Sequence, residues 1–301
     1  MTHHLDFLGK AKIFVPLSIA LVLVSWILLI PAVRGVNPGI DFTGGTSFTI
    51  DFKNPVSTGD LRTMLSKIQG GSVDLSKSVI QNVTGSNQKV ITTQLNVETQ
   101  QDAIDNVTQA LRSDFAVNDI SRESIGHTVS LELTQKAWQA VLLALVMILI
   151  YVSWRFRLRY AVGAVVALIH DVSIAMGVFA LFHIEFNLDT IAAFLTIIGY
   201  SLNDTIVIFD RIRENVQIHK KMGMFELINL SINQSLSRTI NTSLTTLMPV
   251  FILLLFGGAV LQGFSLALFI GIVVGTYSSM YIASPILYGW TLQAAKAKQR
   301  R

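Results

Sequence analysis

The sequence contains no cysteine and few charged residues. The absence of cysteine excludes disulfide frameworks, thiol catalysis and cysteine-based metal sites. Only 14% of the 301 residues are Asp, Glu, Lys or Arg, whereas a soluble domain usually has about a quarter. Because 51% of the residues are hydrophobic, this shortage of charge excludes a disordered tail protein and argues against an ordinary cytosolic enzyme.

The apolar residues gather in six stretches that are almost free of charge. About 20 such residues cross ~30 Å of hydrocarbon as a helix, and helices satisfy their own backbone hydrogen bonds in lipid. The stretches therefore predict six transmembrane helices, five of them within 137–290. They are residues 13–33, 137–154, 160–182, 190–209, 239–256 and 264–290. The first is too long for the apolar core of a cleaved signal peptide, so we expect a retained anchor.

Lysine and arginine are distributed unevenly between the connecting segments. The segments before the first span and after the second, fourth and sixth spans hold 14 of the 23 basic residues. The short loops 183–189 and 257–263 contain none. The positive-inside rule therefore predicts that both termini, 1–12 and the basic 291–301, are cytoplasmic. Residues 35–135 would then form a domain on the outer side of the membrane.

The segment 35–135 has the pattern of a small α+β domain. A strand over 46–52 places Phe48, Ile50 and Phe52 on one face. The other predicted elements are a helix capped by Ser57 or Thr58 that ends near Ile68, strands near 78–84 and 89–95 joined by a turn at Gly85-Ser86-Asn87, a helix capped by Thr99 that ends near Ser113, and a strand near 117–125. The order βαββαβ is that of a ferredoxin-like fold, which hosts many functions.

Residues 39–46 join the first span to this domain and contain Asp41, Gly44 and Gly45. Adjacent glycines permit positive φ and close backbone approach, and Asp41 can accept hydrogen bonds from neighbouring amides. The segment is interpreted as a rigid elbow or as a contact surface for a partner chain. Its glycine spacing fits neither a Rossmann motif nor a P-loop.

Ionisable side chains interrupt the predicted spans at three places. Asp171, next to His170, falls near the middle of the third span, and Asp204 lies about five residues from the cytoplasmic end of the fourth. Arg238 precedes the fifth span at a similar depth. An Asp at the centre of a membrane helix costs roughly 2.5–3.5 kcal/mol, so such residues predict a function by default.

Two interpretations of these residues stay open. Asp204 and Arg238 can form a fixed ion pair that holds two helices together, and His170 and Asp171 can form a hydrogen-bonded couple between helices. Alternatively, Asp204 gains and loses a proton while the helices shift, and the distance to Arg238 changes its proton affinity.

Two further patterns concern helix packing. Gly271 and Gly275 form a small-xxx-small pair in the last span, which is typical of close helix contacts. Residues 224–237 place apolar side chains at helical spacing. They predict either an amphipathic helix along the cytoplasmic surface or a cytosolic helix packed on a loop.

Several of these motifs together resemble the SecD/SecF family of bacterial protein-export membrane proteins. The motifs cover essentially the whole chain and belong to the SecF half of that family. They are the run 199–215 around Asp204, the tract 237–247 at the fifth span, the loop 256–265, the segment 39–46, and His170-Asp171.

This resemblance implies a function and partners. The chain would pair with SecD, act with the SecYEG channel and often YajC, and use the proton-motive force to move an unfolded preprotein, as a member of the RND superfamily. It would lie in a bacterial inner membrane, with residues 35–135 as a periplasmic domain. Asp204 and Arg238 match the family's functional acid and base. Weaker candidates are Asp171, His170, Asn203 and Thr242. We expect contact with membrane lipids and no cofactor, metal, nucleic acid or enzymatic activity.

Three other functions are alternatives to this one. An RND-type exporter of lipids or small molecules usually carries larger external domains than 35–135. An intramembrane aspartyl protease using Asp171 and Asp204 would need a G-x-G-D arrangement, which 199–204 lacks. The third is a passive assembly scaffold whose buried charges only hold helices together.

Overall fold

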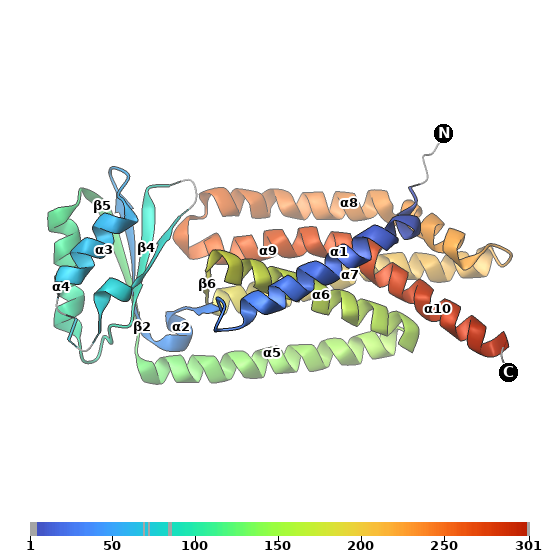
Figure 1. Cartoon of the computed structure of the whole chain (residues 1–301), viewed down its shortest axis with the longest axis horizontal. Helices are drawn as coiled ribbons and strands as arrows, with labels where there is room; N and C mark the ends of the chain where they lie inside the picture. Colours follow the sequence, from blue (N-terminus) through green and yellow to red (C-terminus); the bar gives the residue numbers. More distant parts are fainter. Residues whose placement is uncertain (1–4, 69, 72, 84–85, 300–301) are drawn as a thin grey trace.

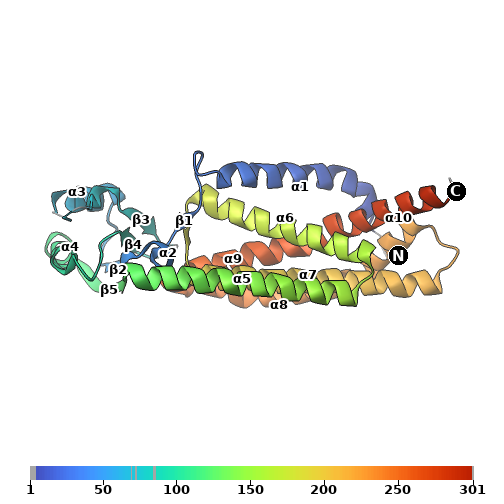
Figure 2. The same cartoon turned by 90° about the horizontal axis from the view of Figure 1, so that it is seen from below.

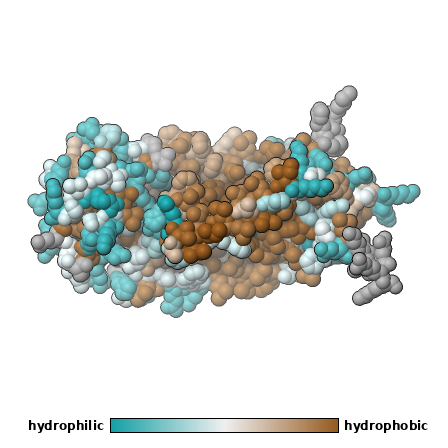
Figure 3. Space-filling view, viewed as in Figure 1, coloured by the Kyte–Doolittle hydropathy of each residue, from teal (hydrophilic) through white to brown (hydrophobic). Residues whose placement is uncertain are grey.

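The computed structural model describes residues 5–68, 70–71, 73–83 and 86–299. A bundle of long helices carries a small α/β domain at one end (Figure 1). The bundle is covered by hydrophobic side chains, whereas the α/β domain is largely hydrophilic (Figure 3). Three sequence predictions lie partly outside the described residues: the terminal segments 1–12 and 291–301, and the turn that includes Gly85.

Six helices in the described part of the chain are long and apolar enough to cross a membrane, which confirms the predicted number of spans. They are α1 (Phe7–Leu29), α5 (His127–Arg155), α6 (Leu158–Phe182), α7 (Leu188–Ile218), α8 (Met224–Phe256), and α9 (Gly258–Ser278) continued through a π-helical turn, η2 (Ser279–Ala283), into α10 (Ser284–Gln299). Helices α1 and α6 lie side by side, and α5 runs along the opposite side of the bundle (Figure 2).

The first two long helices begin before the predicted spans. Helix α1 begins six residues before 13–33 because Asp6 caps it, its carboxylate accepting from the Gly9 amide at 2.8 Å. Helix α5 begins at His127, so the α/β domain ends before the predicted residue 135. A search for charge-free stretches finds only the apolar centre of a helix, whereas the helix itself continues through charged turns.

The predicted separate helix 224–237 was also wrong, because these residues form the first turns of α8. Their apolar side chains Ile228 and Ile232 are fully buried. Asn215 of α7 donates hydrogen bonds to Ser231 and to Gln234 at 2.8 Å each. The apolar face of this segment therefore packs against α7 in an extended helical hairpin.

The predicted loop 257–263 is shorter than expected. Only Gly257 separates α8 from α9. Gly258, the first residue of α9, has φ of 69°, a conformation that glycine adopts without strain. The chain therefore reverses direction within two residues, and α8 and α9 pack as an antiparallel pair.

The α/β domain has the predicted ferredoxin-like arrangement. Its elements are β2 (Gly45–Phe52), α3 (Thr58–Lys67), η1 (Leu75–Lys77), β3 (Val79–Asn82), β4 (Gln88–Thr93), α4 (Gln101–Asp114) and β5 (Val117–Ile125). The sheet has the strand order β3-β4-β2-β5 with every pair antiparallel. Phe48, Ile50 and Phe52 are buried as predicted, together with Leu61 and Leu65 of α3.

Of the two helix caps predicted in this domain, one is confirmed and the other was wrong. Ser57 caps α3 by accepting a hydrogen bond from the Asp60 amide at 3.1 Å. The prediction that Thr99 caps α4 was wrong, because Gln100 occupies the cap position without a side-chain cap. The Gln100 side chain instead donates to the Gly70 carbonyl at 2.8 Å, a contact between distant loops that the local pattern does not show.

A small joint connects the α/β domain to the helical bundle. Strand β1 (Asn37–Pro38) pairs in parallel with β6 (Glu185–Phe186), which lies between α6 and α7. The short helix α2 (Ile40–Thr43) follows β1 and leads into β2. We call β1, α2 and β6 the joint.

Candidate functional site

Asp204 lies on α7 inside the bundle and is 2% exposed. Its carboxylate lies beside the hydroxyl groups of Ser243 on α8 and Thr276 on α9. These two hydroxyl groups are hydrogen-bonded to each other at 2.6 Å. One carboxylate oxygen, Oδ2, has no hydrogen-bond partner among the described residues. The site is therefore a buried carboxylate whose hydrogen-bonding capacity is only partly used.

Arg238 lies near this carboxylate on α8 but does not form the fixed ion pair considered above. It is close enough for an electrostatic attraction to Asp204. Within the described ranges, however, no nitrogen–oxygen pair joins the two side chains within 4.0 Å. Arg238 is exposed and lines a polar hollow with Asp210 and Glu214 of α7. Among the described residues, the buried acid and the exposed base therefore attract each other without forming a direct ion pair.

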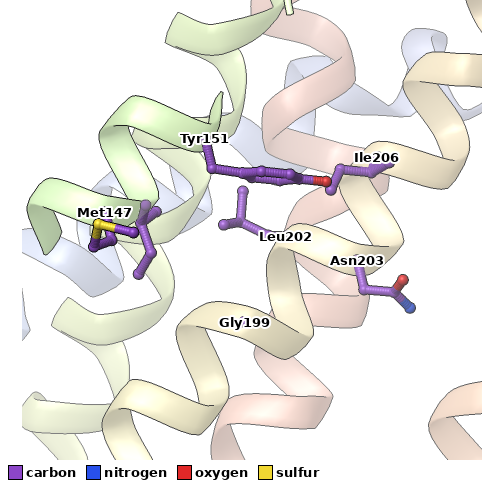
Figure 4. Close-up of a pocket in the computed structure, with 7 residues that line it drawn as sticks. Met147, Tyr151, Gly199, Leu202, Asn203 and Ile206 are labelled. Atoms are coloured by element: carbon purple, nitrogen blue, oxygen red, sulfur yellow. The ribbon is translucent and has the colours of Figure 1, made fainter. Parts of the chain in front are cut away.

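Asn203 lies between this polar hollow and a second, apolar one. The polar hollow has a volume of about 450 Å³. The apolar hollow, of about 490 Å³, lies between α5 and α7 and is lined by Met147, Ile148, Tyr151, Gly199, Leu202, Asn203 and Ile206. Figure 4 shows the Tyr151 ring against Leu202 and Ile206, while the Asn203 amide points away from α5. Asn203 and Ile206 belong to both hollows, so the two are adjacent along one face of α7.

Thr242, one turn after Arg238, does not bond to Asp204. Its hydroxyl donates to the carbonyls of Arg238 and Thr239 in its own helix, each at 3.0 Å. The Thr242 hydroxyl is therefore hydrogen-bonded to the α8 backbone, in the turn that carries Arg238.

The second buried acid, Asp171 of α6, has a complete set of partners. Its Oδ1 lies 2.8 Å from Nδ1 of His170. Its Oδ2 accepts hydrogen bonds from Ser201 of α7 at 2.6 Å and from Ser278 of α9 at 2.8 Å. Asp171 is fully buried and His170 is 5% exposed. This geometry is that of a hydrogen-bonded couple joining three helices, one of the two interpretations left open above.

Two glycines of α9 allow this helix to approach α7 closely beside both buried acids. A Cβ at Gly271 would overlap the Ile197 side chain, and one at Gly275 would lie 3.0 Å from Cβ of Ser201. The small-xxx-small pair therefore lets α9 approach α7 closely, as its spacing predicts. Thr276 and Ser278 follow directly and reach Asp204 and Asp171 respectively.

Sequence reasoning missed Ser243 and Thr276 as members of the site. Ser243 belongs to a run of hydroxyl residues in the fifth span, and Thr276 follows Gly275. The sequence signal available for both residues is a hydroxyl side chain near small residues that mark a helix contact. This signal does not show that the hydroxyl lies beside Asp204, because that depends on how three packed helices are rotated.

The remaining predicted motif lies in the joint. Asp41 accepts a hydrogen bond from the Leu188 amide at 2.7 Å, so it bonds to the start of α7 and not to a neighbouring amide as expected. Gly44 and Gly45 have φ of 69° and 125°. A Cβ at Gly45 would overlap the Thr93 carbonyl, so both conformation and space favour glycine at this position.

The sequence matches two family models. Residues 104–293 match the model described as protein export membrane protein SecD/SecF, C-terminal, and residues 30–56 match the SecD/SecF GG motif. The chain is 39% identical to protein translocase subunit SecF of Petrotoga mobilis over 98% of this chain and 99% of that one. It is 38% identical to protein translocase subunit SecDF of Thermus thermophilus, covering 95% of this chain and 38% of that one.

The fold also matches a solved structure. The crystal structure of SecDF from Thermus thermophilus aligns with a TM-score of 0.84 at 36% identity. The alignment covers 96% of this chain and 39% of the solved chain, so the chain spans about two fifths of that protein. A second SecDF structure, in a form named super-membrane-facing, aligns with a TM-score of 0.71. The chain therefore belongs to the SecD/SecF family of protein-export membrane proteins, in its SecF branch.

Proposed function

We propose that this chain is a protein-export subunit that pairs with SecD and uses the proton-motive force to promote preprotein translocation across the inner membrane. Its role would be mechanical and not enzymatic, with SecYEG as the channel and YajC as an accessory partner. The α/β domain would lie on the periplasmic side and both termini in the cytoplasm. Curated relatives named as translocase subunits support the export role.

One observation carries the proposed mechanism: within the described residues, the Asp204 carboxylate is buried with one oxygen that accepts no hydrogen bond, and Arg238 is near enough to attract it without a direct ion pair. A charged Asp204 attracts Arg238 and favours closer approach of α7 and α8. A neutral Asp204 removes this attraction and lets the two helices separate. Since the two states favour different helix arrangements, each proton gained or lost shifts a conformational equilibrium.

The energy that one proton releases by crossing the membrane is sufficient for a small shift of packed helices. Moving one charge through 100 mV supplies about 2.3 kcal/mol, which biases an equilibrium roughly 40-fold. That is sufficient to switch between two packed arrangements but not to pull a long segment of preprotein in one step. We infer that the helix shift is passed through α1, α5 and the joint to the α/β domain.

The hollows suggest where SecD would dock. Both open on the face of α7 that carries Asn203, between α5 and the Arg238 end of α8. The fused SecDF relative places both halves in a single chain, which supports their association. A SecD helix seated there would cover Arg238 and Asp210 and exclude water from the titrating site.

The proposal is tested by replacing Asp204 with Asn, which keeps the shape of the side chain but removes its charge. The variant is co-reconstituted with SecD and SecYEG, and preprotein translocation is measured with and without a membrane potential. We expect normal assembly with SecD and loss of the stimulation by the potential. Asp102→Asn, on the exposed face of α4, is the matched control and should behave as wild type.

Unchanged stimulation in Asp204→Asn would contradict the mechanism. The passive-scaffold function would then be favoured, and the hydrogen bonds that satisfy both oxygens of Asp171 are the observation that supports it.

A further inference from the structure

Four carboxylates from four different elements lie in or next to the joint. Glu185 of β6 is half-buried, and the negative charges of Asp41 on α2, Glu123 on β5 and Asp189 on α7 are near enough to act on it. In the described part of the chain, none of the four forms an ion pair within 4.0 Å. Negative charge therefore accumulates where the two parts of the molecule meet.

Glu185 also forms a hydrogen bond across the joint. Thr92 of β4 donates to Oε1 of Glu185 at 3.1 Å, linking the sheet of the α/β domain to the bundle. Two further hydrogen bonds lie in the joint: the Gly39 amide donates to the Phe186 carbonyl at 2.9 Å, and the Leu188 amide donates to the Asp41 carboxylate at 2.7 Å. Any change in the charge of Glu185 thus acts directly on the interface.

The other polar groups around Glu185 do not offset its charge. Lys89, the basic residue of β4, points to the other face of the sheet, with its amine 3.5 Å from the Thr58 hydroxyl. Gln81 of β3 and Asn37 of β1 donate to the His183 carbonyl, at 3.4 and 3.3 Å. The exposed His183 side chain is the remaining titratable group next to β6.

We propose that Glu185 is a proton-binding site that controls how firmly the α/β domain docks on the helical bundle. When Glu185 is neutral, its repulsion with Asp41, Glu123 and Asp189 disappears and the bond from Thr92 remains possible. When it is charged, four carboxylates repel one another across the joint. Proton binding therefore favours the docked arrangement.

The expected direction of the pH effect follows from burial. Burial raises the pKa of Glu185 in the docked arrangement, and the neighbouring carboxylates raise it further. A group whose pKa is raised stabilises the arrangement that raises it at low pH, and this contribution is lost as pH rises through the raised value. Docking is therefore firm in acid and weakens toward neutral pH. This inference goes beyond the export mechanism and does not depend on Asp204.

The test uses the full chain in lipid nanodiscs. Because the sequence has no cysteine, two cysteines introduced at the exposed positions Ser113 and Val260 give a clean pair of spin labels. Distances between the labels are measured by pulsed electron resonance at about pH 5 and about pH 8, on either side of a raised carboxyl pKa. We expect one narrow distribution in acid and a several-fold smaller docked population at the higher pH.

Three variants decide the result. Glu185→Gln should keep the narrow distribution at both pH values, and Glu123→Gln should reduce the pH-dependent change without abolishing it. His183→Asn removes the neighbouring titratable side chain and should respond as the unsubstituted sequence does. A pH response that survives in Glu185→Gln, or that disappears in His183→Asn, would overturn the proposal, as would an identical distribution at both pH values before substitution.

The outcome separates this inference from the export mechanism. The part of the pH response that Glu185→Gln removes should persist in Asp204→Asn, because Asp204 lies within the bundle and outside the joint. If Glu185→Gln does not accumulate, Glu123→Gln alone still decides, since an undiminished response in that variant contradicts the proposed repulsion.

Discussion

Asp171 and Asp204 lie on neighbouring helices, and the structure surrounds them very differently. Three groups from three helices bond to Asp171, and they account for both of its oxygens. Asp204 keeps one oxygen without a partner beside two hydroxyls that bond to each other. A fully bonded carboxylate resists a change of charge because each partner would have to rearrange, whereas a partly bonded one can change its charge with little rearrangement. Burial alone therefore does not identify the acid that titrates.

The largest effect that tests this difference between the two acids is expected when Asp171 is removed. Asp171→Ala leaves the hydroxyls of Ser201 and Ser278 and the His170 ring without their shared acceptor. Removing one partner of a buried charged network typically costs about 3–5 kcal/mol. We expect a loss of this size in the free energy of unfolding, measured by denaturation in mixed micelles, and poor accumulation in cells. A loss near zero would show that Asp171 does not hold the helices.

The next effect concerns the close contact that both sites share. Gly271→Leu forces a side chain into the Ile197 position, and overpacking of this kind typically costs about 1–3 kcal/mol. We expect an intermediate loss of stability, together with weakened export, because α9 carries partners of both acids. Gly289→Leu is the matched control, since the space around a Cβ at this position is open. Equal effects of the two substitutions would contradict the proposed role of the α7–α9 contact.

The smallest effect on stability is expected at the hydroxyl pair beside Asp204. Ser243→Ala removes a hydrogen bond to Thr276, which is worth about 0.5–1.5 kcal/mol. Because Ser243 also lies beside Asp204, which we propose to titrate, the same change should shift the pH dependence of potential-driven export. Thr245→Ala, an exposed hydroxyl that bonds only within its own helix, is the control. A pH profile unchanged in Ser243→Ala would remove this hydroxyl from the mechanism.

The sequence predicted the parts of the fold that depend on local patterns. Apolar runs located all six spans, and alternation in 46–52 placed Phe48, Ile50 and Phe52 in the domain core. Helix ends were less accurate, since α5 and α8 continue through polar turns that pack on other elements. The β1–β6 pair was not predicted, because two residues carry no strand pattern and their partners are distant in the chain.

In the candidate site, too, local sequence patterns predicted some residues, whereas others depend on helix packing. Asp204 was identified because a charge in an apolar run is conspicuous, and Arg238 because it lies at a similar depth. Ser243 and Thr276 could not be distinguished from other hydroxyl residues of their spans, since helix rotation decides which ones face Asp204. The free oxygen of Asp204 and the closed network of Asp171 likewise became visible only with the packed helices.

The central claim is that Asp204 changes its protonation state within the working pH range while Asp171 does not. Infrared difference spectroscopy of the chain reconstituted with SecD tests it directly, with Asp204→Asn used to assign the band. We expect a protonated-carboxyl band that decreases as pH rises and is absent from Asp204→Asn. A band that stays constant across the pH range over which export responds to the membrane potential would contradict the account, and Asp204 would then be a brace between helices.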